Sequence, residues 1–523
     1  MTEPNTEPGA PEGASGGQGA GQVPTESGQT PALDVILEEI DTVVEPVHEA
    51  TSMAPAVGIA VAGGPMITLP GEATAPAFER KGDSVRSGLS QAGPVAIAGI
   101  VVNAAGALVV VAVARLVTPQ AYGDIAQLLG LFFILSMPGS AVLVGVVRRV
   151  TALQTSGQAH LIRHWVARVH RIALVALALE VVVVIVLRDW IAHQLSLPNS
   201  QGVVFILVAA GIWILLSVDR GLLQAHRAYR PLAGNLLMEG AIRTLFVVGL
   251  VVAGLGVAGY AFGVFISEVV ATAHAHWLAS RAWSDPTTVP VKVASPDLLT
   301  AGVLARRKLL ADVSAAFVGL ALLGLLQNVD VIVLGRLDHA NVGPYAAISV
   351  ASKALVFGAI ALGAYLLPEA TIRWNEGGHA IRQLGVTLIF LAVPAIVLLA
   401  IAEFIPHWFL TVVFSAKLSG GAPAFATLVG AMIFLSFSVL VTNYLFGTGS
   451  RWIVLLLVGG SGLALGLIGA AHGQIVATAR ADLVVQAALA VAMGIAFVSI
   501  HYRHRGRHWV GRLPLRRQAP ASE

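Results

Sequence analysis

The stretch LGLLQNVDVIVLGRLDHANVGPYAA, residues 323–347, decides the fold of this chain. A membrane-length apolar run contains two amides, Gln327 and Asn328, and a carboxylate, Asp330, near its end. It then breaks at Gly335, and a polar connector leads to a second apolar run that begins at Tyr345. Because such polar groups are costly in hydrocarbon, they are expected to face protein or water rather than lipid.

The same order of features occurs earlier in the chain. Residues 111–123, VAVARLVTPQAYG, also carry an apolar run, an Arg-Leu step at Arg115, a polar connector, a tyrosine and the start of another apolar run. Two matching exits from a membrane divide the chain into two halves.

The composition is that of a membrane protein. The chain has 523 residues, of which 56% are hydrophobic and 12% charged, whereas about 25% of residues are charged in a soluble domain. It contains no cysteine, which excludes disulfides and thiol chemistry. We therefore predict an all-α, polytopic membrane protein.

Charge is distributed unevenly along the sequence. Residues 1–83 hold thirteen acidic residues against Arg80 and Lys81, and the basic excess lies in the apolar remainder. The basic balance therefore indicates positive membrane loops, not nucleic-acid binding. Residues 1–85 are rich in Gly, Pro and Ser and are predicted to be disordered, with a short amphipathic helix as an option at 33–44.

The apolar runs predict about twelve transmembrane helices in two six-helix lobes. They lie near 90–113, 124–147, 172–187, 203–218, 232–254, 258–278, 309–334, 344–367, 384–402, 423–445, 453–472 and 482–500. The predicted organisation is a disordered acidic tail at 1–85, a first lobe at 86–280, a connector at 281–308, a second lobe at 309–500 and a basic tail at 501–523.

Lysine and arginine counts predict the orientation. With the N-terminus inside, the inside loops hold sixteen of these residues and the outside loops hold five. This obeys the positive-inside rule, so both termini are expected to be cytoplasmic. Six helices per half imply lobes related by an axis along the membrane normal, as in parallel-repeat transporters. The expected location is the cell membrane.

Several ionisable residues fall inside predicted spans. Glu239 and Arg243 are spaced i,i+4, which is compatible with a local ion pair; the alternative, equally weighted, is that they face a cavity. Lys353 lies about 15 Å deep, since it is ten residues from Gly343 at about 1.5 Å per residue. It has small neighbours and no acid within one turn, which favours a water-filled, anion-attracting cavity; the alternative is a partner carboxylate, Asp330 or Asp312.

The histidines give weaker indications. His160, His164 and His170 lie among arginines, which predicts a solvated basic face. His274 and His276 fall near a predicted helix end and are expected to be interfacial. No phosphate-binding loop, GxSxG or HExxH motif occurs, so the sequence predicts no enzyme activity and no cofactor.

Five sequence features, taken together, resemble the polysaccharide (oligosaccharide-lipid) flippase family of the multidrug/oligosaccharidyl-lipid/polysaccharide exporter superfamily. They are Asn103 and Gly106 with ARLVTPQAYG at 114–123; DRGLLQAHRAY at 219–229; Glu239 with Arg243; NVDVIVLG at 328–335 with Tyr345; and LFGTGSR at 445–451. Phe414-Ser415, where the family has Phe-Gly, and the long acidic tail depart from the family pattern.

The resemblance implies a flippase that moves a polyprenyl-diphosphate-linked oligosaccharide between leaflets by alternating access. The implied partners are this lipid-linked glycan, the bilayer, and a glycan polymerase or glycosyltransferases. The candidate cavity residues are Lys353, Arg243, Glu239, Asn328, Asp330 and Asp312. Cations at mid-depth suit a diphosphate, and one of the three acids is a candidate for coupling to protons or sodium.

Other readings remain open at this stage. A multidrug exporter of the same superfamily would need acids and aromatics in its cavity, and the two aspartates fit that reading. Residues 148–158 lack the pattern expected of a major-facilitator transporter, and a membrane glycosyltransferase would need acidic residues on a sizeable outer loop. A membrane scaffold that recruits partners through its tail is a further alternative.

Overall fold

The computed structural model describes residues 84–155, 158–282, 302–375, 381–448 and 450–510. These residues form helices and no strand, which confirms the all-α prediction. The acidic tail, with the helix suggested at 33–44, lies outside the described residues.

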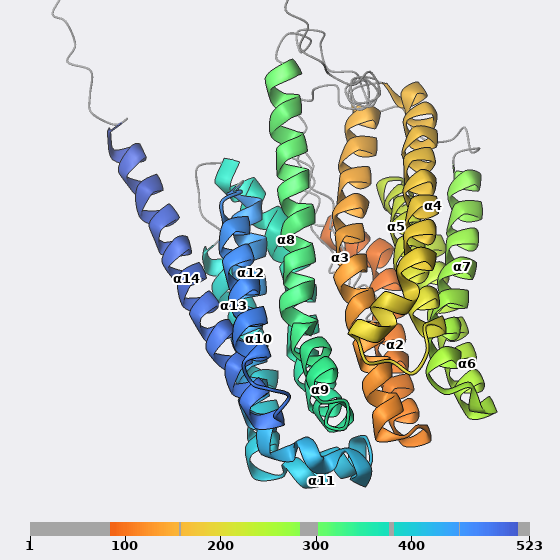
Figure 1. Ribbon diagram of the computed structural model, residues 1–523. Helices are drawn as coiled ribbons and strands as arrows, with labels where there is room; N and C mark the ends of the chain where they lie inside the picture. Colours follow the sequence, from red (N-terminus) through yellow and green to blue (C-terminus); the bar gives the residue numbers. More distant parts are fainter. Residues whose placement is uncertain (1–83, 156–157, 283–301, 376–380, 449, 511–523) are drawn as a thin grey trace, which may run out of the picture. The chain divides into compact units, whose positions relative to one another are not determined.

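Twelve helices and four shorter elements make up the described chain (Figure 1). We call the first six helices the first lobe: α2 (Ser84–Leu116), α3 (Pro119–Thr155), α4 (Ile162–Gln194), α5 (Gln201–Ala225), α6 (Tyr229–Leu250) and α7 (Gly256–Ala282). We call the second six the second lobe: α8 (Gly302–Leu337), α9 (Val342–Asn375), α10 (Ile381–Phe404), α12 (Ala422–Gly447), α13 (Ile453–Gly469) and α14 (Ile475–Val510). The shorter elements are η1 (Ala159–Leu161), η2 (Val251–Leu255), α11 (Pro406–Val413) and η3 (Ala416–Gly421).

Each of the twelve predicted runs falls mainly on its own helix. Ten stretches of the described chain are long and apolar enough to span a membrane, and α13 is a shorter apolar helix. One of the ten, residues 229–281, contains both α6 and α7. These two helices are separated at Gly254, whose φ of +86° is a conformation that glycine adopts most readily.

Several helices extend beyond their predicted spans because charged residues do not end them. The third predicted span began near residue 172, but Arg163, Arg168 and Arg171 already lie on the first turns of α4. The fourth predicted span ended before Arg220, which lies inside α5. In both cases the helix continues beyond the point where mean hydropathy falls.

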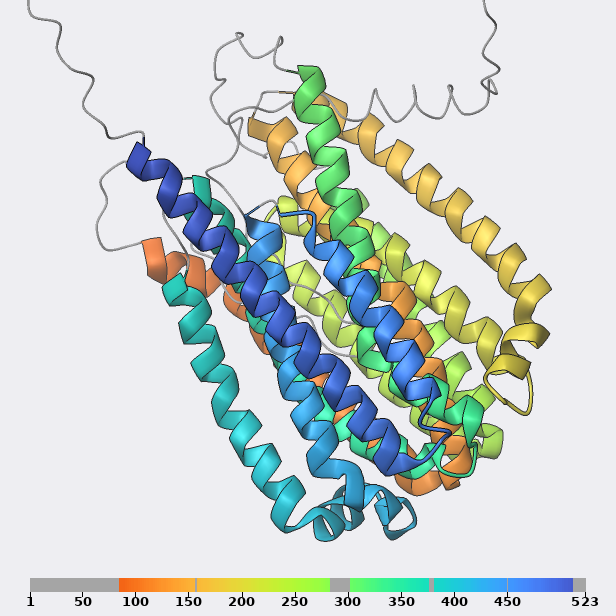
Figure 2. The same cartoon turned by 60° about the vertical axis from the view of Figure 1, so that its left-hand side comes forward.

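Helices at the margins of the bundle turn apolar side chains outward. Figure 2 shows α4 along one edge, where Val175, Leu179 and Val186 are exposed. On α10, Ile389, Phe390 and Val393 are exposed in the same way. Surfaces of this kind suit lipid contact, so the exposed residues fit the predicted membrane location.

The two lobes meet mainly along α3 and α8, with α9 also packing on α3. A single apolar cluster runs through this contact from Phe132 and Phe133 on α3 to Leu323 and Leu326 on α8. We call the α3–α8 contact the seam.

Candidate functional site

The two Arg-Leu exits found in the sequence lie side by side at one end of the seam. A Cβ atom on Gly343, at the start of α9, would lie 2.0 Å from the carbonyl oxygen of Pro119, at the start of α3. A Cβ atom on Gly123 would lie 2.1 Å from Val342 Cγ1. The turns α2–α3 and α8–α9 are therefore in backbone contact, and they close the end of the seam that is predicted to face outside.

Side chains reinforce this closed end. Arg115, at the end of α2, donates from Nε to the carbonyl oxygen of Phe414 at 3.2 Å and also donates to the carbonyl of Val412. Tyr122 on α3 contacts the Phe414 ring edge-on, with centroids 6.3 Å apart. The segment after α11 is thus fastened to the first lobe, although it belongs to the second.

Further along the seam, buried amide groups lack partners. Gln127 on α3 and Gln327 on α8 are almost completely buried. Neither the oxygen nor the nitrogen of either side chain has a hydrogen-bond partner. Leaving such groups unsatisfied costs free energy, so these amides lower the stability of the packed seam.

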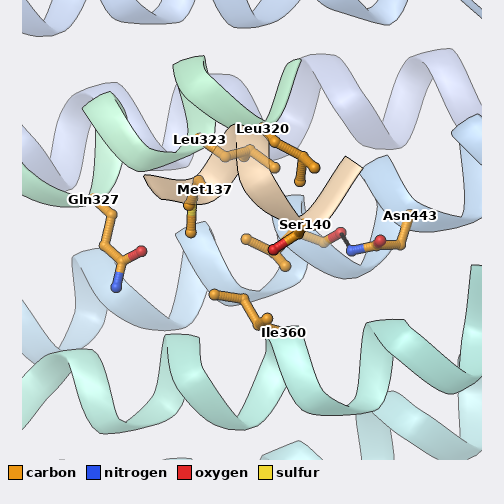
Figure 3. A pocket seen from close by; sticks show the side chains of 8 residues that line it. Met137, Ser140, Leu320, Leu323, Gln327, Ile360 and Asn443 are labelled. Carbon is orange, nitrogen blue, oxygen red and sulfur yellow. Dashed lines mark hydrogen bonds between the residues drawn. The ribbon is translucent and has the colours of Figure 1, made fainter. Parts of the chain in front are cut away.

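Gln327 also lines a small cavity between the lobes. Figure 3 shows Met137 and Ser140 from α3, Leu320 and Leu323 from α8, Ile360 from α9 and Asn443 from α12 around it. Its volume is about 10 Å³, enough for one water molecule at most. This cavity is therefore too small to hold a substrate in this state.

The first lobe contains a buried network of four charged residues, which we call the first-lobe network: Arg220, Glu239, Arg243 and Glu268. Glu239 accepts from Arg220 at 2.5 Å and from Arg243 one turn away on α6. Arg243 also pairs with Glu268 on α7. The predicted Glu239–Arg243 pair is confirmed, as part of a larger network in which two cations balance two carboxylates.

Sequence reasoning missed Arg220, the largest fully buried side chain in the described chain. Its Nε donates to Asn235 Oδ1 at 2.8 Å, and its guanidinium lies over the Trp213 ring, 5.4 Å from the centroid. The i,i+19 separation from Glu239 gives no local signal. The only sequence feature that marks the position is its place in the 219–229 motif.

In the second lobe, Lys353 is buried against α8. Its Nζ lies 3.2 Å from Asn328 Oδ1 and 3.5 Å from Asp330 Oδ1, and Ser349 donates to the other Asp330 oxygen at 3.0 Å. Lys353 is 5% exposed. In this state the cation therefore has the partner carboxylate that was the alternative to a water-filled cavity. We call Lys353, Asp330 and Asn328 the second-lobe cluster.

A second buried carboxylate lies beside this cluster. Asp482 on α14 is fully buried and interacts electrostatically with Asp330 and Lys353. One of its oxygens accepts from Gln486 at 3.0 Å, and the other has no partner. With both aspartates ionised, this region would hold one more negative charge than positive charge.

The six predicted site residues therefore do not form one cluster. Glu239 and Arg243 lie in the first-lobe network, and Lys353, Asn328 and Asp330 lie in the second-lobe cluster. Asp312 lies on α8, and its side chain falls outside the described residues. The structure also draws attention to Glu180, a partly buried carboxylate within α4 that approaches Gly211 on α5.

Comparison with solved structures identifies the fold. The chain is similar to an inward-facing multidrug resistance MATE family transporter of the MOP superfamily, with a TM-score of 0.54 and 13% identity, over 76% of this chain and 95% of that one. It is also similar to a Vibrio cholerae MATE transporter, with a TM-score of 0.52 and 15% identity, over 79% of this chain and 96% of that one.

The chain therefore has the fold of MOP superfamily transporters, in agreement with the architecture that the sequence resemblance implied. A scan against protein-family models found no match, and a search of curated proteins found none either.

Proposed function

We propose that this protein is a membrane transporter that works by alternating access between its two lobes. The observation that carries the proposal is the seam. It is closed at one end by backbone contact between equivalent turns, yet it contains buried amides without partners. Two packings of close energy are what a switching interface requires, and the fold shared with MATE transporters supports the same function.

The substrate we propose is a polyprenyl-diphosphate-linked oligosaccharide, moved from the inner to the outer leaflet for cell-envelope polysaccharide synthesis. The sequence motifs favour it, and so does the way Lys353 is held. Its 3.5 Å separation from Asp330 is longer than the roughly 2.7–2.9 Å of a strong charge-assisted hydrogen bond. A diphosphate entering an opened seam could therefore compete for this cation while the lipid tail stays in the bilayer.

Once it has been moved to the outer leaflet, the lipid-linked glycan needs an enzyme that uses it there. A glycan polymerase or glycosyltransferase acting on lipid-linked glycans is the partner that the chemistry calls for. Asp482 and Asp330 supply a candidate coupling site, because binding one proton or one sodium ion would balance the extra negative charge beside Lys353.

Multidrug cation export is the second candidate, and the same pair of aspartates favours it. Two buried carboxylates against one lysine would attract a cationic drug as readily as a coupling ion. Under that reading, Lys353 would serve only to hold Asp330.

Reconstituted vesicles distinguish the two candidates. A fluorescent polyprenyl-diphosphate oligosaccharide and a fluorescent organic cation are supplied in parallel, and arrival on the opposite side is measured with a membrane-impermeant quencher. We expect movement of the lipid-linked glycan and its loss in Lys353→Met/Asp330→Asn, which removes both charges of the pair together. Transport of the organic cation, without movement of the lipid-linked glycan, by the parent protein would make the drug exporter the correct reading.

The matched control is Arg188→Gln. Arg188 pairs with Asp189 on an exposed part of α4, where both side chains are about half exposed or more. This variant also removes one charge of an ion pair but touches neither network, so it should transport as the parent does.

A further inference from the structure

Three side chains from three helices meet near one end of the first lobe. His170 Nε2 on α4 lies 2.9 Å from Asp219 Oδ1 on α5, and His276 Nδ1 on α7 lies 3.4 Å from the same oxygen. One donor atom from each residue lies within 4.8 Å of the others. The end in question is the one predicted to face the cytoplasm.

The hydrogen bonds of His170 leave one position to be filled. Its Nδ1 lies 3.1 Å from the carbonyl oxygen of Val166, one turn earlier, so this nitrogen must carry a proton. Its Nε2 faces a carboxylate oxygen, which is also an acceptor. A neutral imidazole carries one proton only, so either a second proton or a bound cation must lie between Nε2 and Asp219.

Asp219 also has an oxygen atom without a partner. It is 1% exposed, and its Oδ2 has no hydrogen-bond partner. Among the ion pairs of the described residues, Asp219 pairs with the two histidines only, because the neighbouring Arg220 turns to Glu239. A buried carboxylate without a permanent cation is costly, and a metal ion would remove that cost.

The set of donors suits a transition metal. Two imidazole nitrogens and one carboxylate oxygen, with water in a fourth position, form a common tetrahedral zinc environment. A histidine that binds metal through one nitrogen usually donates its other N–H to a carbonyl or carboxylate, as His170 does toward Val166. His276 is 63% exposed on its side chain, so an ion can reach the site from solvent.

We propose that His170, Asp219 and His276 bind a divalent transition metal of the zinc class. The ion would join α4, α5 and α7 at one end of the first lobe. Its ligand Asp219 directly precedes Arg220, which belongs to the first-lobe network. The site is independent of the proposed substrate, because none of its three residues lies in the seam or in either charge network.

Metal binding to the purified, metal-stripped full-length protein tests this proposal. Zn²⁺ affinity is measured by calorimetry, and Co²⁺ is used as a spectroscopic probe because its visible absorption reports tetrahedral coordination. We expect one Zn²⁺ per chain and a tetrahedral Co²⁺ spectrum. His276→Ala should weaken binding by more than about 100-fold, since even changes outside the coordination shell cost about 10- to 100-fold.

The exposed position of His276 keeps the test interpretable, because its replacement should not disturb folding. His274→Ala is the matched control: it lies two residues away on α7, contacts Asn235 rather than Asp219, and should leave Zn²⁺ affinity unchanged. Absence of Zn²⁺ binding by the parent protein would overturn the proposal. So would equal affinity in His276→Ala, which would show adventitious binding by other histidines.

Discussion

Replacing Glu239 with glutamine should strongly destabilise the first lobe. Glu239 is 4% exposed and accepts hydrogen bonds from two guanidinium groups, Arg220 and Arg243. Glutamine keeps the shape but leaves two buried cations facing one carboxylate, Glu268. Breaking a buried ion pair by removing one partner costs about 3–5 kcal/mol, which corresponds to a factor of roughly 100 to several thousand in the unfolding equilibrium.

The double variant Glu239→Gln/Arg243→Met gives the sharper result. It leaves Arg220 and Glu268 as one cation and one anion, so charge balance returns. We therefore expect the double variant to be more stable than the sum of the single losses implies, with a coupling energy of about 0.5–3 kcal/mol. Thermal unfolding of the detergent-solubilised protein, followed by fluorescence-detected gel filtration, is measured for the parent, Glu239→Gln, Arg243→Met and the double variant.

Arg188→Gln is again the control, since an exposed ion pair contributes about 0–1 kcal/mol. Strictly additive losses would refute the reasoning, because they would mean that Glu239 and Arg243 act independently. An unfolding temperature for Glu239→Gln equal to that of the parent would refute it as well.

Three further predictions follow from the seam and the second-lobe cluster. Gly343→Ala should disfavour the closed end by about 1–3 kcal/mol, because its Cβ would overlap the Pro119 carbonyl; labelling of cysteines placed on the α2–α3 turn should then become faster. Arg115→Ala should expose the segment after α11 to protease, while costing only about 1 kcal/mol because the guanidinium is solvent-exposed. Lys353→Met should lower the yield of folded protein, and adding Asp330→Asn should restore it, since the pair is buried; unchanged yield in the single variant would contradict the pairing.

Most of the helical architecture could be predicted from the sequence, because membrane-length apolar runs are a local signal. The two halves were also visible, through the repeated Arg-Leu exits. Helix ends were predicted less well where charged residues continue a helix, as at Arg220. A hydropathy window sees that charge but cannot see its partners on α6: Glu239, which neutralises it, and Asn235, which accepts a hydrogen bond from it.

In the candidate site, too, contacts within one helix could be predicted from the sequence, whereas contacts between helices could not. The Glu239–Arg243 pair was predictable because both residues lie on one helix at i,i+4. The partner of Lys353 lies 23 residues away on another helix, so its identity depends on how α8 and α9 pack. The meeting of His170 and His276 at Asp219 depends in turn on three helices, and no spacing in the sequence indicates it.

Because the sequence contains no cysteine, labels attached to introduced cysteines can test alternating access between the two lobes directly. Spin labels at Gln120→Cys, at the start of α3, and at Ala340→Cys, on the α8–α9 turn, occupy exposed positions and report the distance across the closed end in lipid membranes. Alternating access predicts two distance populations: a short one for the state described here and a longer one that grows when Gly343→Ala is introduced. A single short distance that neither this variant nor the lipid-linked glycan changes would contradict the account.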